Sequence, residues 1–97
     1  MKYKDLTLDI EKRIARRKKH KVELRRKESE MLEILMRKNE TTVSKIELAE
    51  TIWDRNAEIV SNTIEAHMST LRKKIDSGFK KKLIHTIPCA GYKLEEH

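Results

Sequence analysis

The segment TIPCAGYKL, residues 86–94, holds the only proline and the only cysteine of the chain and could form a reactive site. A nucleophilic or metal-binding Cys89 would need a neighbouring base, a second thiol or further ligands. The chain has no second cysteine, and His85 lies four residues earlier on the incoming strand. Pro88 lacks an N–H group and suits a strand end, and Gly91 permits backbone angles that other residues avoid. The segment therefore indicates a turn between two strands rather than a cysteine site.

The other polar residues show no pattern typical of an enzyme. The histidines have no metal-ligand spacing, and no glycine-rich phosphate loop or Ser-His-Asp set is present. Glu47 and Glu50 read as a helix cap and a surface residue rather than as a catalytic carboxylate pair. We therefore expect no enzymatic activity, no cofactor and no metal.

Composition points instead to a polyanionic partner. The chain has 97 residues, a formal net charge of +7 and a pI of about 9.6. A small basic domain of this kind usually meets nucleic acid first, and an anionic membrane or an acidic protein second. No apolar run reaches the roughly 18 residues of a membrane span, and no signal-peptide pattern opens the chain. A single cysteine fits a reducing interior, so we expect a cytoplasmic protein without membrane contact.

The elements that must position these residues begin with short strands. Residues 5–10 alternate apolar and polar, with Leu6, Leu8 and Ile10 pointing one way, which predicts a half-buried strand. Residues 13–24 predict two further strands separated by a Lys-Lys-His turn. Together they predict a small antiparallel sheet of three or four strands.

A helical period follows from Lys27 and ends near residues 37–39, with Met31 and Leu35 in its apolar stripe. Arg25 and Arg26 stand at the start of this helix. Arginine cannot accept bonds from the free N–H groups and opposes the helix dipole. We therefore expect a partner such as phosphate to relieve this conflict.

Two more helices and a hairpin complete the chain. Ser44 and Glu47 form a capping box that opens a second helix, residues 54–61 read as a loop, and residues 62–76 predict a third helix with Gly78 as its stop. Residues 83–87 and 91–94 predict a terminal hairpin. The third helix has a single core-facing stripe of Ile64, Met68, Leu71 and Ile75.

This order predicts an α+β fold: a winged helix-turn-helix with an N-terminal antiparallel sheet, three helices and a C-terminal β-hairpin wing. We expect residues 1–97 to form a single domain. Residues 1–24 would form the sheet, residues 25–76 the three-helix core, and residues 77–97 the wing.

The chain resembles the OmpR/PhoB-type effector domain of bacterial response regulators over nearly its whole length. The family pattern appears as LTLD, VEL…KE…ML, VSKIEL…IW, NTIEAHMSTLRKKID and IHTI…GYKL. The resemblance implies that the third helix lies in the major groove of double-stranded DNA and that the wing reaches the adjacent minor groove. It also implies head-to-tail copies on direct repeats, monomeric without DNA, an RNA polymerase contact, and a receiver domain in the full-length protein of a two-component system.

The resemblance and the basic charge together assign candidate site residues. Arginine can contact guanine or phosphate with two bonds, and threonine can bond a base or touch a thymine methyl group. The expected RNA polymerase contact is the loop of Asp54, Arg55, Asn56, Ala57 and Glu58. The expected DNA-binding residues are Asn62, Thr63, Glu65, Ala66, His67, Ser69, Thr70, Arg72 and Lys73 of the third helix, Thr86 and Lys93 of the wing, Arg25 and Arg26, and Trp53, which alternatively plugs the core.

Departures from the family pattern qualify these assignments. Asn62 and Thr70 stand where basic residues are frequent DNA contacts, and Pro88-Cys89 stands where an Arg-Gly pair is common. Without that arginine, we expect the wing to contact backbone through Thr86 or Lys93 more than it reads bases. The main hypothesis is sequence-specific DNA binding for transcription regulation. The alternatives are a winged-helix protein-interaction module and a non-specific nucleic-acid binder.

Overall fold

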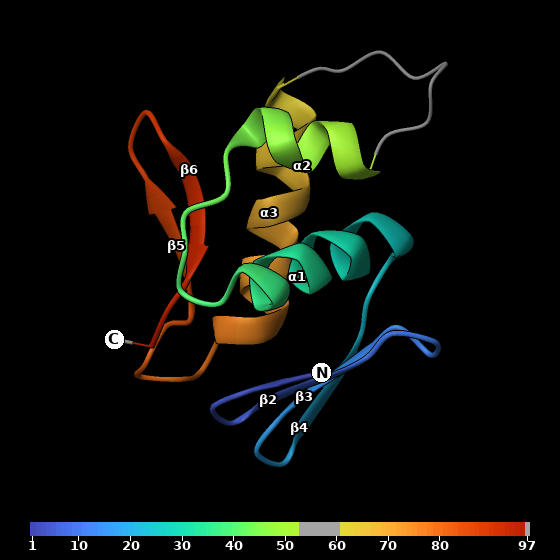
Figure 1. The fold of residues 1–97 in the computed structure, drawn as a ribbon. Coiled ribbons are helices and arrows are strands. Elements are labelled where there is room, and N and C mark those ends of the chain that lie inside the picture. Colours follow the sequence, from blue (N-terminus) through green and yellow to red (C-terminus); the bar gives the residue numbers. More distant parts are fainter. Residues whose placement is uncertain (53–60, 97) are drawn as a thin grey trace.

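The computed structural model describes residues 1–52 and 61–96 and has the predicted architecture. The N-terminal sheet lies at one end of the molecule, below α1, and the wing hairpin lies beside α3 (Figure 1). Trp53 and the predicted polymerase loop from Asp54 to Glu58 lie outside the described residues. The elements are β1 (Lys2–Tyr3), β2 (Leu6–Asp9), β3 (Ile14–Arg17), β4 (His20–Glu23), α1 (Arg26–Lys38), α2 (Lys45–Ile52), α3 (Ser61–Asp76), β5 (Ile84–Ile87) and β6 (Gly91–Leu94).

The N-terminal sheet is antiparallel with the order β1-β2-β3-β4, the four-stranded form of the prediction. Leu8 pairs with Ala15, and both are buried on the inner face together with Leu6. The turn between β3 and β4 has no glycine, and Lys18 takes a left-handed φ of 56° there. The inward placement predicted for Ile10 is wrong. Because β2 ends at Asp9, Ile10 falls in the following turn and is 40% exposed.

The helices begin as their cap residues dictate. The backbone N–H of Glu47 donates to the Ser44 hydroxyl at 3.0 Å, as the capping box predicted for α2. At the start of α1, the buried Glu28 accepts from the Arg25 backbone N–H at 2.8 Å. Glu28 also pairs with Lys74 of α3 at 2.7 Å. A carboxylate from within the chain therefore offsets the dipole of α1, and phosphate contact by Arg25 and Arg26 stays a prediction.

The core fills the space between the helices, the inner face of the sheet and the wing. The predicted stripe of α3 is completely buried, with no residue of it more than 1% exposed. Burial of this apolar surface is the main stabilising term of the fold. The largest fully buried side chains are Leu6, Leu8, Met31, Leu32, Leu35, Leu48, Ile64, Met68, Leu71, Ile75, Leu83 and Ile84.

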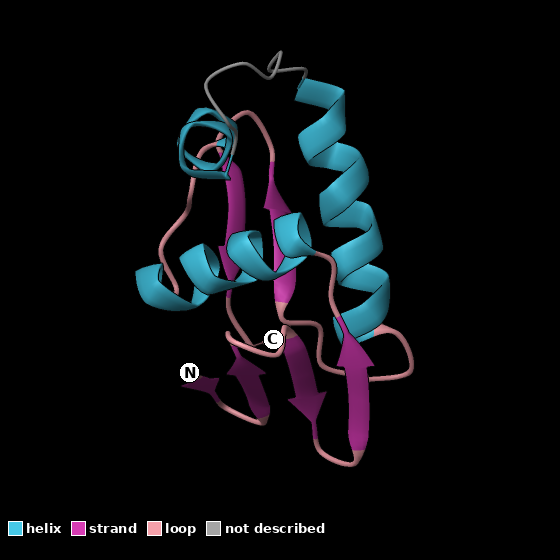
Figure 2. Cartoon of the chain, turned by 90° about the vertical axis from the view of Figure 1, so that its right-hand side faces the viewer, coloured by secondary structure: helices cyan, strands magenta, loops and turns pink. Residues whose placement is uncertain are grey.

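The wing is a hairpin, and Cys89 lies in its turn. The Ala90 N–H donates to the Ile87 carbonyl at 3.0 Å, and Cys89 takes a left-handed φ of 61°. Cys89 is an exposed turn residue. Figure 2 shows the two wing strands running behind α1 and the turn at the end of the molecule opposite the N-terminal sheet.

The wing is fixed to the segment before α2 by a short β-bridge. Val43 and Tyr92 exchange two backbone hydrogen bonds of 2.7 and 2.9 Å. Gly91 enters this bridge with a φ of +142°, and a Cβ atom there would lie 2.0 Å from the Val43 carbonyl oxygen. Only glycine permits this close approach of two backbones.

Candidate nucleic-acid interface

The surface of α3 opposite the core is polar and open. Glu65, Ala66, Ser69, Thr70 and Lys73 are exposed along it. Of the other predicted residues, His67 and Arg72 are half-buried, and for Asn62 and Thr63 only the helical backbone is described. The exposed residues recur at helical spacing on one side of α3, as entry into a major groove requires.

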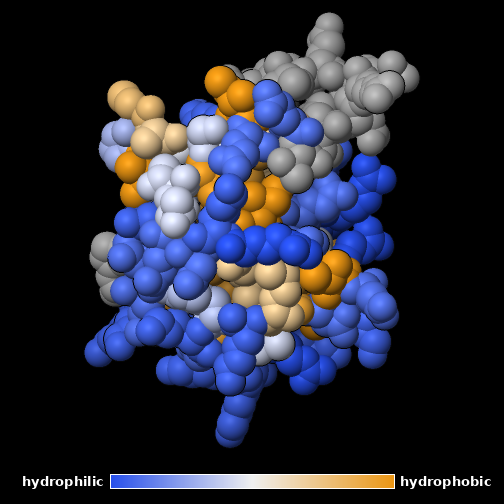
Figure 3. Space-filling model, in the orientation of Figure 1, coloured by the Kyte–Doolittle hydropathy of each residue, from blue (hydrophilic) through white to orange (hydrophobic). Residues whose placement is uncertain are grey.

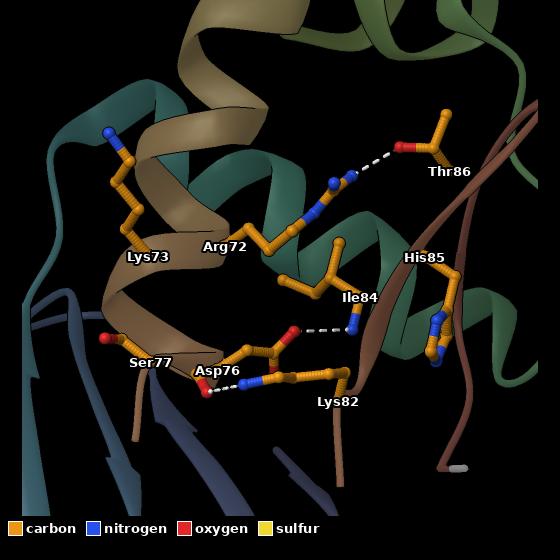
Figure 4. A pocket seen from close by; sticks show the side chains of 8 residues that line it. All are labelled: Arg72, Lys73, Asp76, Ser77, Lys82, Ile84, His85 and Thr86. Carbon is orange, nitrogen blue, oxygen red and sulfur yellow. Dashed lines mark hydrogen bonds between the residues drawn. The ribbon is translucent and has the colours of Figure 1, made fainter. Parts of the chain in front are cut away.

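A cationic pocket of about 640 Å³ separates α3 from β5 (Figure 4). Arg72 crosses the pocket from α3, and its guanidinium donates to the Thr86 hydroxyl on the wing. The buried Nε atom of Arg72 has no hydrogen-bond partner in the described part of the chain. The pocket is lined by Arg72, Lys73, Asp76, Ser77, Lys82, Ile84, His85 and Thr86.

The carboxylate in this pocket does not repel an anion strongly, because donors surround it. Asp76 is 2% exposed and accepts from the backbone N–H groups of Leu83 at 2.9 Å and Ile84 at 3.1 Å. Lys82 reaches the Asp76 backbone carbonyl at 2.9 Å. The pocket therefore offers positive charge toward solvent.

Arg17 of β3 joins the sheet to α3 and to the segment that leads into the wing. Its side chain is 3% exposed, and it bonds Asp76 at 2.9 Å and Asp5 at 3.2 Å. Its guanidinium also donates to the Lys81 backbone carbonyl and lies 4.2 Å from the centre of the Phe79 ring. Asp76 ends α3 and accepts from Leu83, just before β5, and from Ile84 at its start. This network therefore links the position of the wing to that of α3.

A second link joins α2 to α3. The Lys45 ammonium donates to the Glu65 carboxylate, with both side chains partly exposed, 39% and 53%. This hydrogen bond raises the pKa of Lys45, because it stabilises the charged ammonium. Glu65, Ser69 and Arg72 line one side of a smaller hollow of about 270 Å³ between α3, α2 and the wing.

The tip of the wing carries no charge. Pro88, Cys89 and Ala90 are all exposed, and apolar side chains gather at the wing tip at the upper left of Figure 3. Thr86 is exposed, whereas the ammonium of Lys93 lies 2.7 Å from the Glu95 carboxylate. The wing therefore presents a hydroxyl group and apolar atoms, rather than an arginine, to any partner.

The predicted arginine pair lies at the N-terminus of α1, which contacts the C-terminal half of α3 through the Glu28–Lys74 pair. Arg25 and Arg26 are exposed, and Arg26 lies 3.7 Å from Glu30. Lys74 of α3 also reaches the Glu23 backbone carbonyl at 3.2 Å, so the start of α1 lies close to the last turns of α3.

The net charge is concentrated on the N-terminal sheet. Residues 1–24 contain nine lysines and arginines and four carboxylates, which gives +5, and residues 25–97 therefore contribute only +2. The register aligns Lys2, Thr7, Arg16 and Lys21 in one row across the outer face. Hydrophilic side chains cover most of this region at the bottom of Figure 3. The overall charge is therefore a poor measure of the charge near α3.

Sequence reasoning overlooked Arg17, Lys45 and Asp76, and only strand alternation carried a usable signal. Arg17 lies two residues after the buried Ala15 in β3, and alternate residues of a strand point to the same face. An inward side chain could therefore have been inferred for Arg17. Lys45 and Asp76 sit at helix ends, where their partners depend on tertiary packing.

Other types of site find no support in the residues that the structure describes. Within residues 1–52 and 61–96, no three histidine, cysteine or carboxylate side chains are grouped as metal ligands. Among the helices in these ranges, none is both long and apolar enough to cross a membrane.

Comparison with known proteins gives consistent matches. A family model described as "Transcriptional regulatory protein, C terminal" matches residues 19–94. The transcriptional activator protein IrlR of Burkholderia pseudomallei is 38% identical over 91 residues, which cover 94% of this chain and 40% of that protein. The transcriptional regulatory protein PcoR of Escherichia coli is 35% identical over the same coverage. The chain thus spans about 40% of the length of these curated relatives.

Solved structures match over almost the whole chain. The C-terminal domain of the nisin resistance regulator NsrR superposes with a TM-score of 0.80 and 33% identity, covering 96% of this chain and 93% of that one. The DNA-binding domain of the response regulator AdeR, solved with an intercistronic region, has a TM-score of 0.84 over 100% of both chains. At 20% identity, this second match supports the fold alone.

Proposed function

Because the chain belongs to the family of C-terminal domains of transcriptional regulatory proteins, the DNA-binding effector domains of OmpR/PhoB type, we propose that it reads a specific duplex sequence with α3 in the major groove. The wing would follow the adjacent minor groove. The observation that carries this proposal is the cationic pocket between α3 and β5. A helix and a hairpin placed in neighbouring grooves have one phosphate strand between them, and in this arrangement the pocket between α3 and β5 would face that strand.

The two halves of the interface have different tasks in this proposal. Lys73 and Lys82, exposed at the pocket, would contact phosphate and supply affinity that falls with salt. Ser69 and Thr70 on the exposed face of α3 would meet base edges and supply sequence preference. Thr86 would add a backbone contact from the wing.

The remaining assignments are proposals for the longer protein. Relatives of which this chain covers 40% have room for a receiver domain, and we propose that one controls this domain in the cytoplasm. We also propose head-to-tail pairs on direct repeats, and polymerase contact through the segment from Asp54 to Glu58. Footprinting of two copies, and polymerase binding by variants of that segment, would test these two proposals.

Enrichment of random duplex DNA tests the central proposal. We expect a recurrent sequence motif and affinity that falls steeply between about 50 and 200 mM salt. Lys73→Ala should weaken binding to every duplex by a similar factor, and Lys12→Ala on the distant sheet turn is the control with the same charge change. Equal affinity for unrelated duplexes would favour a non-specific binder. A stoichiometric protein complex without any DNA selection would favour a protein-interaction module.

A further inference from the structure

We propose that Glu65 reads a base and selects cytosine in the major groove. This inference rests on the proposed function and deepens it, because it names one base that α3 recognises. The observations that carry it are the exposure of Glu65 on α3 and its link to Lys45.

One of the two carboxylate oxygens of Glu65 is available for a further hydrogen bond. Oε1 accepts from the Lys45 ammonium, which extends from the first residue of α2. The Glu65 side chain remains 53% exposed, and Ser69 lies one turn further along the same side of α3. Oε2 can therefore accept a bond from a group entering beside α3, while Lys45 restricts the orientation of the carboxylate.

The contribution of Glu65 to the stability of the fold does not explain why an acidic residue stands at this position. An exposed ion pair contributes about 0–1 kcal/mol to folding, and a carboxylate facing phosphates is repelled by them. Lys45 reduces that repulsion, because its ammonium offsets the charge of Glu65. A carboxylate on this surface becomes favourable only where the bound duplex presents a hydrogen-bond donor.

The chemistry of the groove then identifies the base. An ionised carboxylate can only accept hydrogen bonds. The major groove offers donors only from the N4 amino group of cytosine and the N6 amino group of adenine. Adenine places its N7 acceptor next to N6, and N7 repels a carboxylate, whereas an amide side chain suits that pair. Cytosine is therefore the base that Glu65 would select.

The test compares enrichment from random duplexes for the wild-type chain, Glu65→Gln and the control Glu33→Gln. Glu33 is also part of a surface pair, with Arg37 of α1, on another helix. We expect one motif position to prefer cytosine about fivefold or more in the wild type, equivalent to about 1 kcal/mol. In Glu65→Gln that preference should shift toward adenine, since glutamine bonds N6 and N7 together. Glu33→Gln should retain the wild-type motif.

Lys45→Met gives an independent readout. It should lower affinity for all duplexes, because the repulsion between Glu65 and phosphate is no longer offset, and it should weaken the cytosine preference without shifting it toward adenine, because the carboxylate loses its fixed orientation. If the wild type enriches a motif and Glu65→Gln enriches the same one unchanged, the inference fails and the proposed function stands. If the wild type enriches no motif, the proposed function fails and the inference with it.

Discussion

The buried Arg17 network makes a strong prediction about stability. Arg17→Met would remove the cation and leave Asp76 buried without its ionic partner. Loss of one member of a buried pair costs about 3–5 kcal/mol, and the lost contact with the Phe79 ring adds about 0.5–2 kcal/mol. Leu83 and Ile84 still donate to Asp76, so we expect a total near the lower end, about 3–4 kcal/mol.

Urea unfolding followed by circular dichroism measures this loss as a lower midpoint at unchanged slope. A domain of this length has about 5–15 kcal/mol of stability in total, so the variant would be marginal or partly unfolded. Arg16→Met is a matched control, because Arg16 is the next residue in β3 but points outward and is exposed. It should change stability by less than about 0.5 kcal/mol. Arg17→Lys should be intermediate, since a lysine keeps the charge but not the forked donors.

A loss below about 1 kcal/mol for Arg17→Met would refute this reasoning, since it would mean that water or rearranged side chains replace the network. A loss equal to that of Arg16→Met would lead to the same conclusion. In the folded fraction of Arg17→Lys, we also expect weaker DNA binding without a change in preferred sequence, because the wing loses its fixed position relative to α3.

Three further predictions address the wing, the phenols and the charge distribution. Gly91→Ala should destabilise the fold by more than about 3 kcal/mol in urea unfolding because its Cβ has no room, whereas Gly78→Ala, where the Cβ meets nothing within 4 Å, should cost only about 1 kcal/mol. Burial, with the hydrogen bond to a carboxylate, raises the pKa of Tyr3 to about 12; stability should therefore fall as the pH rises from about 10 to 12, by about 1–2 kcal/mol more in the wild type than in Tyr3→Phe. Arg16→Glu on the outer face of the sheet should change the salt dependence of DNA affinity less than Lys73→Glu beside the pocket. Binding titrations between about 50 and 200 mM salt measure this difference. Equal effects of the two substitutions would mean that the sheet also contacts the duplex.

Much of the fold could be predicted because local patterns encode it. Alternation in residues 5–10 and 13–24 and the helical stripe of 62–76 identify the strands and α3, since burial on one face imposes a period on each element. The Ser44 cap is local as well, because its partner is three residues away. Ile10 was misplaced because alternation does not reveal where a strand ends.

The candidate DNA-binding residues on α3 could be assigned only as a face. The buried stripe determines which residues are exposed, but it does not reveal how their charges are paired. Lys45 and Glu65 are 20 residues apart, and the Arg72–Thr86 bond joins a helix to a hairpin. The net charge of +7 indicated a polyanionic partner, but +5 of it belongs to residues 1–24, which form the N-terminal sheet rather than α3.

The sequence by itself determined the types and order of the elements, the buried side of α3 and the nature of the segment around Cys89. Only the tertiary structure decided that Arg17 would bond Asp76, 59 residues away in the sequence. It also decided that the Glu28 carboxylate would be buried at the start of α1, where it accepts from the Arg25 backbone N–H. The physical reason is that periodicity and capping act over a few neighbouring residues, whereas a buried charge needs partners from distant segments. Those partners become identifiable only when packing brings the sheet, α3 and the wing together.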